Sequence, residues 1–192
     1  MSRATSRFEA IVLPHLDAAY NLARWLVRDQ HAAEDIVQDA CLRAFRYFDK
    51  FHGDDARPWL LRIVRNSCYS WLQDAKRAPM SVTFDDDIEL DESAEITMAM
   101  GRSETPETLL IRKAERAEVN AAIKALPAAY REVIILREIE DMPYETIATV
   151  MQVPVGTVMS RLSRARGLLR ATLQCTFEGK IRETASGHHH AT

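Results

Sequence analysis

The sequence lacks the features of membrane-spanning, disulfide-stabilised and metal-binding chains. No apolar run approaches the roughly 18 residues that cross a bilayer. The start MSRATSRFEA has no apolar signal-peptide core, so we expect a cytoplasmic protein with no membrane contact of its own. Its three cysteines show no CxxC spacing, and their odd number argues against a disulfide framework. No Cys/His cluster indicates zinc, so we predict neither a metal nor another cofactor.

Motifs of the common enzyme classes are also missing. The sequence has no paired Ser/His/Asp set, no phosphate-binding glycine loop and no Rossmann glycine pattern. An enzyme is therefore the least favoured class. What is present is an ordinary globular balance, with 47% hydrophobic and 28% charged residues.

The chain has no overall excess of basic charge, since its formal net charge is −3. The charges are unevenly distributed. Residues 1–77 carry 12 basic and 10 acidic groups, residues 78–110 carry 1 and 9, and residues 111–192 carry 12 and 9. An acidic middle segment thus lies between two mildly basic ends, so nucleic-acid binding by either end stays possible.

Apolar residues recur at helical spacing along most of the chain, and no strand-like alternation of any length occurs. We expect one helix from about Phe8 to Leu26, a second capped by Asp29, and a third with Pro58 in its first turn. The predicted fold is all-α, with two small helical domains. Its divisions are residues 1–77, a flexible acidic linker 78–106, residues 107–175, and a polar tail 176–192.

Two shorter segments have alternative interpretations. The acidic linker is either a solvated tether or a segment that covers a basic surface when DNA is absent. The tail contains His188, His189 and His190, which would suit a metal, although a disordered tail is favoured.

Residues 143–169 have the pattern of a helix-turn-helix. PYETIATVMQ would be the supporting helix, VPV the turn and GTVMSRLSRARGLL the recognition helix. One face of the second helix is polar, and the opposite face is apolar through Val158, Leu162, Ala165 and Leu169. The apolar face would hold the helix in its domain while the polar face enters a DNA major groove. A basic helix facing only solvent is the alternative.

The block LPAAYREVIILREIEDMPYETIATVMQVPVGTVMSRLSRARGLLRATL follows an earlier pair, AAEDIVQDACLRAFRYFDKF and ARPWLLRIVRNSCYSWLQDAKR. In this order the blocks resemble regions four and two of bacterial RNA polymerase sigma factors of the extracytoplasmic-function (ECF) group, related to sigma-70. The resemblance covers about residues 8–77 and 107–173. It implies a dissociable specificity subunit without an active site of its own.

The implied partners are the polymerase core, through its largest-subunit clamp and flap region, and promoter DNA. Residues expected to bind the polymerase share one helix face: Asp35, Gln38, Asp39, Leu42 and Arg46. Asp35 and Asp39 are like charges at i, i+4, which costs an isolated helix a few tenths of a kcal/mol. A basic partner would relieve this repulsion. An ordinary solvated acidic face is the alternative.

Region two would also melt and read the minus-ten element. The helix after Pro58 has a polar stripe suited to a DNA backbone with bases close by. Trp59 would stack on an unpaired base or lie in the core. The loop before it would capture an extruded base, unless its acids cap the next helix. The predicted minus-ten residues are His52, Asp54, Asp55, Trp59, Arg62, Arg65, Asn66 and Tyr69.

Region four would bind the minus-thirty-five element as duplex. The predicted contacts are Thr157, Met159, Ser160, Arg161 and Arg164. Met159 stands where many family members have a basic residue, so one phosphate or base contact is weakened. Gln152 replaces the small residue often found in such turns.

An anti-sigma factor is a further implied partner, and a linker of about thirty residues would permit the two domains to be held together. Two other functions are considered: a helix-turn-helix regulator without polymerase binding, and a sigma mimic that sequesters an anti-sigma factor. The Asp35/Asp39 face and the polar stripe of residues 59–73 argue against the first. The intact Arg161/Arg164 face and the lack of a receiver domain argue against the second.

Overall fold

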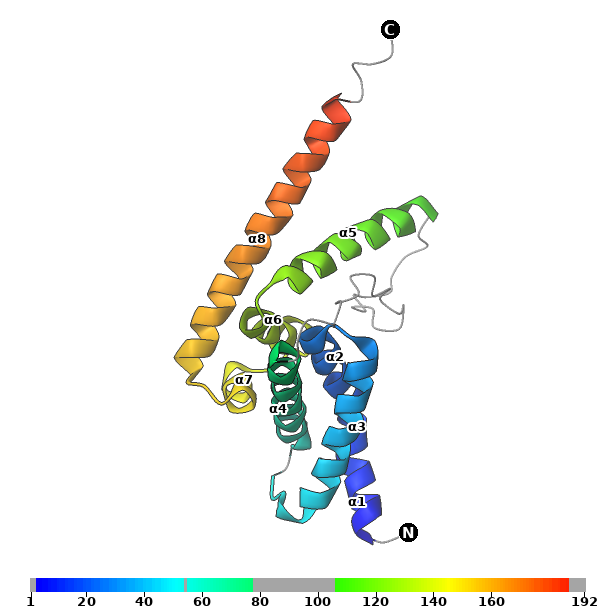
Figure 1. Ribbon diagram of the computed structural model, residues 1–192, viewed down its shortest axis with the longest axis vertical. Helices are drawn as coiled ribbons and strands as arrows, with labels where there is room; N and C mark the ends of the chain where they lie inside the picture. Colours follow the sequence, from blue (N-terminus) through cyan, green and yellow to red (C-terminus); the bar gives the residue numbers. More distant parts are fainter. Residues whose placement is uncertain (1–2, 54, 78–105, 187–192) are drawn as a thin grey trace.

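The computed structural model describes residues 3–53, 55–77 and 106–186 (Figure 1). All regular structure in these residues is helical, which confirms the predicted all-α fold. Asp54, the segment 78–105 and the histidines at 188–190 lie outside the described residues. Among the described helices, none combines the length and apolarity needed to span a bilayer.

The N-terminal part is a bundle of helices joined by short 3-10 turns. Its elements are α1 (Arg3–Val12), η1 (Leu13–His15), α2 (Leu16–Val27), α3 (Gln30–Tyr47), η2 (Phe48–Lys50) and α4 (Ala56–Arg77). The helix expected from Phe8 to Leu26 is interrupted by η1, which contains Pro14 at its start. Proline removes a backbone donor and clashes with the preceding turn, so a continuous helix is disfavoured there.

Local signals set the next helix boundaries as expected. The Asp29 side chain accepts a hydrogen bond from the Ala32 backbone N–H at 2.7 Å and caps α3. Pro58 lies in the first turn of α4, where its missing N–H costs nothing. The Asp55 carboxylate accepts from the Arg57 N–H at 2.9 Å, so Asp55 caps α4. This is the capping role considered for it in the sequence.

The C-terminal part contains α5 (Pro106–Ala125), α6 (Ala128–Ile134), the π-helix η4 (Ile135–Ile139), α7 (Tyr144–Met151) and α8 (Val155–Ser186). Helix α8 continues well beyond residue 175, through much of the segment expected to be a polar tail. In Figure 1, α5 and α8 extend from the body of the molecule as two diverging rods. Helices α6 and α7 pack against the first half of α8.

The two parts are packed together, which the sequence did not indicate. Helix α4 lies against α7, and α2 lies against α6 (Figure 1). One continuous cluster of buried side chains runs through both parts, from Leu22 and Leu61 in the first to Leu136 and Ile147 in the second. The structure therefore shows a closed arrangement of the two domains.

Gln152 generates a prediction about stability. It ends α7 in the left-handed conformation with φ 55°, which a side chain with a Cβ adopts at a cost. We expect Gln152→Gly to raise the free energy of unfolding by about 0.5–1 kcal/mol. Urea denaturation measures this change. Gln152→Ala is the control and should not stabilise, because alanine keeps the Cβ; equal effects of both variants would contradict the explanation.

Candidate functional site

The first turns of α8 have a buried apolar face and an exposed polar face, as the recognition-helix pattern predicts. Val158, Leu162 and Ala165 are buried against α6 and α7, whereas Met159, Ser160 and Arg164 are exposed. Thr157 and Arg161 are half-buried. The turn is tight, because the Val153 N–H bonds the Ala148 carbonyl at 3.1 Å and the Thr157 N–H bonds the Pro154 carbonyl at 2.9 Å. The five residues predicted to contact duplex DNA thus share the first turns of one helix.

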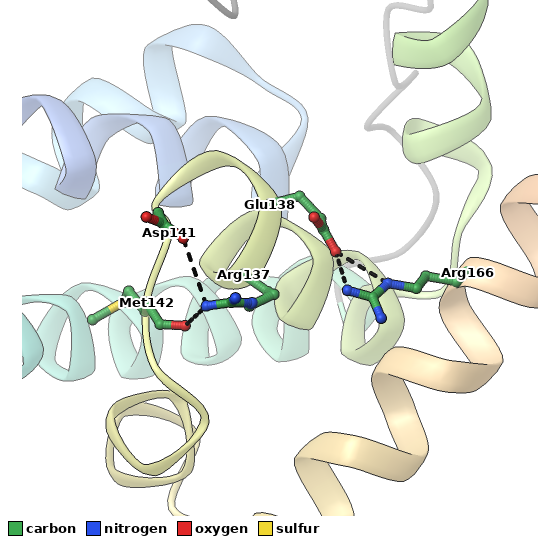
Figure 2. A network of polar contacts seen from close by, with 5 residues as sticks. All are labelled: Arg137, Glu138, Asp141, Met142 and Arg166. Carbon is green, nitrogen blue, oxygen red and sulfur yellow. Dashed lines mark hydrogen bonds and ion pairs between the residues drawn. The ribbon is translucent and has the colours of Figure 1, made fainter.

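A polar network beside this helix was not anticipated. Glu138, on the π-helix η4, accepts two hydrogen bonds from Arg166 of α8, at 2.6 and 3.1 Å (Figure 2). Its neighbour Arg137 points the other way, donating to the Met142 carbonyl at 2.9 Å and lying over the Tyr144 ring. The sequence signal for this network was the charged run at residues 137–141, between the apolar helices α6 and α7. The network ties η4 to the recognition helix.

The predicted polymerase-binding face of α3 is entirely exposed. Asp35, Gln38, Asp39, Leu42 and Arg46 all lie at the surface. Two large apolar residues that we did not select, Phe45 and Tyr47, are also exposed, at 47% and 55%. Apolar groups gathered beside acidic ones on a surface are typical of a protein-binding site.

The predicted minus-ten residues differ in their exposure to solvent. His52, Asp55 and Asn66 are exposed, and Arg62 is half-buried. Trp59 is also half-buried and packs on Phe51, with ring centroids 5.0 Å apart. Its core interpretation therefore has structural support.

Arg65 and Tyr69 are held by a residue of the C-terminal part. The Glu132 carboxylate, on α6, forms an ion pair with Arg65 and accepts a hydrogen bond from the Tyr69 hydroxyl at 2.9 Å. The Arg65 guanidinium also lies over the Tyr69 ring, 4.6 Å from its centroid. The Glu132 side chain is fully buried, and that of Arg65 is only 15% exposed.

A second carboxylate makes a similar bridge. Glu140, which follows η4, forms an ion pair with Arg57 of α4 and accepts a hydrogen bond from the Asn21 amide at 3.3 Å. Arg57 was not among the predicted site residues. We call Arg65–Glu132 and Arg57–Glu140 the two interdomain ion pairs.

Burial dominates the electrostatics of this interface. It raises the pKa of the Glu132 carboxyl, outweighing the lowering by Arg65 and by the Tyr69 hydrogen bond. Burial and the Glu132 charge raise the pKa of Tyr69. The pKa of Arg131 falls to about 10, because the group is buried and the charge of Arg28 is near. Buried charge is costly even when paired, so this interface contains opposing contributions.

Within residues 3–53, 55–77 and 106–186, no three His, Cys, Asp or Glu side chains are arranged to hold a metal ion. Of the three thiols, Cys68 is buried, and burial raises its pKa to about 12. Cys41 is half-buried and Cys175 is exposed.

The structure defines a class of protein with two packed helical domains, the second of which contains a helix-turn-helix. Residues 11–78 match the family described as sigma-70 region 2, and residues 116–169 match sigma-70 region 4. The RNA polymerase sigma-H factor of Pseudomonas aeruginosa is 37% identical over 87% of this chain and 86% of its own length. The ECF RNA polymerase sigma-E factor of Escherichia coli K12 is 41% identical over 69% of each.

Two solved structures have the same fold. The sigma factor RpoE from Bartonella quintana, solved in complex with the anti-sigma factor NepR, has a TM-score of 0.64 and 28% identity, covering 88% of this chain and 97% of that one. CnrH, solved with the cytosolic domain of CnrY, has a TM-score of 0.61 and 26% identity over 89% and 90%. This chain belongs to the sigma-70 family of RNA polymerase sigma factors, in its ECF group.

The raised pKa of Glu132 predicts a pH effect. The folded chain holds the Glu132 proton more tightly than the unfolded chain, so deprotonation favours unfolding. We expect the free energy of unfolding of the wild type to fall, relative to that of Glu132→Gln, as the pH rises from the ordinary carboxyl pKa to the raised one. Above that range the difference should be constant. Urea denaturation of both proteins measures it, and a wild type that gains relative stability with rising pH would disprove the assignment.

Proposed function

We propose that this sigma factor directs the RNA polymerase core to promoters through three surfaces. The α3 face binds the core, the α4 stripe contacts the minus-ten element, and the start of α8 reads the minus-thirty-five duplex. The observation that carries the proposal is the matched pair of regions 2 and 4 with all of the polymerase-binding face exposed. Domain boundaries at residues 77, 106 and 175 are part of the same proposal.

Control by an anti-sigma factor belongs to the proposal as well. The sigma factor RpoE of Bartonella quintana was solved in complex with the anti-sigma factor NepR, and CnrH in complex with the cytosolic domain of CnrY. A plain helix-turn-helix regulator is disfavoured, because it has no use for an exposed acidic and apolar face on α3. A sigma factor of this family would act in the cytoplasm, where the polymerase core meets promoter DNA.

Reversing charge on α3 tests polymerase binding. Asp35 and Asp39 are exposed and make no described contact that holds the fold, so changing both to Lys should leave the protein folded. We expect binding to core polymerase and run-off transcription from a promoter library to be lost, because two attractive contacts become repulsive. The control changes Asp17 and Asp74, which are exposed elsewhere on region 2, to Lys. Equal transcription by both double variants would refute the assignment.

Arg164 tests the duplex-reading surface. Its side chain is exposed on the recognition helix, one turn beyond Ser160. A phosphate or base contact of arginine is worth about 1–3 kcal/mol. We therefore expect Arg164→Ala to weaken binding to minus-thirty-five duplex DNA about tenfold, while core-polymerase affinity is unchanged. Arg170→Ala, on another face of α8, is the control, and an equal loss of both activities in Arg164→Ala would count against separate surfaces.

A further inference from the structure

The two interdomain ion pairs join groups with opposite roles in the proposed function. Arg57, Arg65 and Tyr69 belong to α4, the helix proposed to contact the minus-ten element. Glu132 and Glu140 belong to region 4. We propose that region 4 inhibits region 2 in the free chain, with the Glu132 and Glu140 carboxylates occupying arginines that DNA phosphates would otherwise bind. This inference rests on the proposed role of α4.

The chemistry of the contacts supports this competition. Arginine recognises carboxylate and phosphate oxygens with the same planar donor groups. Glu132 is fully buried against Arg65, and the Glu140 side chain is 7% exposed against Arg57. Tyr69, the aromatic group proposed to lie near bases, also donates its hydroxyl to Glu132. The carboxylates therefore occupy donor groups that phosphates would need, and they leave the Arg65 side chain 15% exposed and that of Arg57 29% exposed.

Closure also affects the other DNA-binding surface. Arg161, at the start of the recognition helix, is half-buried and lies close enough to Glu132 and Tyr69 to affect their pKa values. Arg164 stays exposed. The closed form therefore covers two proposed minus-ten residues and places one proposed minus-thirty-five residue, Arg161, near them.

Other charged groups near this interface disfavour the closed arrangement. Arg131, on α6, is only 6% exposed, and two of its guanidinium nitrogens have no hydrogen-bond acceptor among the described residues. Arg28 adds a like charge near Arg131. Buried unpaired charge disfavours a packed state. These costs oppose closure, so they lower the energy that polymerase or DNA must supply to open the chain.

Paired substitutions test whether the carboxylates hold the domains together. Small-angle scattering of the full chain should show a larger radius of gyration for Glu132→Ala/Glu140→Ala than for the wild type. The matched control is Glu145→Ala/Glu178→Ala, which removes two exposed carboxylates of the same part for which no interdomain bond is described. We expect this control to stay compact. Circular dichroism checks that each variant is folded.

A charge exchange separates the ion pair from general packing. Glu132→Arg and Arg65→Glu should each expand the chain, because each places like charges together. The double variant should regain the compact form, since the pair is restored with reversed polarity. Failure of the double variant to recover, when both single variants are folded and expanded, would contradict a specific ion pair.

DNA binding supplies the second measurement. The probe is a forked DNA with an unpaired minus-ten strand, from a promoter that the wild-type chain transcribes with core polymerase. Apparent affinity scales with the fraction of open chains, so Glu132→Ala/Glu140→Ala should bind it about tenfold or more tightly than the wild type. The Glu145→Ala/Glu178→Ala control should bind the forked DNA as the wild type does.

Each outcome has one meaning. Equal scattering from the wild type and Glu132→Ala/Glu140→Ala, whether compact or extended, overturns the interdomain contact. If Glu132→Ala/Glu140→Ala expands the chain without raising its affinity for the forked DNA, the proposal that region 4 inhibits region 2 is wrong. If no promoter is transcribed and no DNA is bound by any variant, the proposed function itself fails, whereas the scattering result still stands.

Discussion

The contact between the two domains holds one carboxylate, that of Glu132, entirely out of water. This group is completely buried, and the described hydrogen-bond donors to it, Arg65 and Tyr69, both come from the other domain. A carboxylate removed from water without such partners would cost several kcal/mol. The charged Glu132 carboxylate therefore has a low free energy in only two environments: in contact with its donors on α4, or in open solvent. Partial separation, which buries the charge but breaks its bonds, is the least favourable arrangement.

Much of the local structure could be predicted from the sequence, because it depends on neighbouring residues. The Asp29 cap, Pro58 in a first turn, and the buried Val158, Leu162 and Ala165 stripe all follow from spacing within one helix. The exposed α3 face followed for the same reason. Since these features need no knowledge of distant contacts, periodicity was sufficient.

The contacts between domains could not be predicted, because their partners are 67 and 83 residues apart in the sequence. A charged residue such as Glu132 in an amphipathic helix is normally assigned to solvent. The π-helix η4 also alters the helical register, and it brings Glu138 to Arg166 while Glu140 faces Arg57. Periodicity at 3.6 residues per turn misses such a shift. Arg57 and Glu140 were therefore absent from the predicted site.

The different exposure of the two region 2 surfaces implies an order of binding. In the closed form the α3 face is free, whereas Arg65 and Tyr69 on α4 are covered. Under the roles proposed above, polymerase would engage α3 before the domains separate, whereas DNA would reach Arg65 and Tyr69 only after they do. A free chain would then bind DNA weakly until polymerase binds. Two buried guanidinium nitrogens of Arg131 also lack an acceptor among the described residues, which reduces the energy needed to open the closed form, and a partner that binds only the open form can supply that energy.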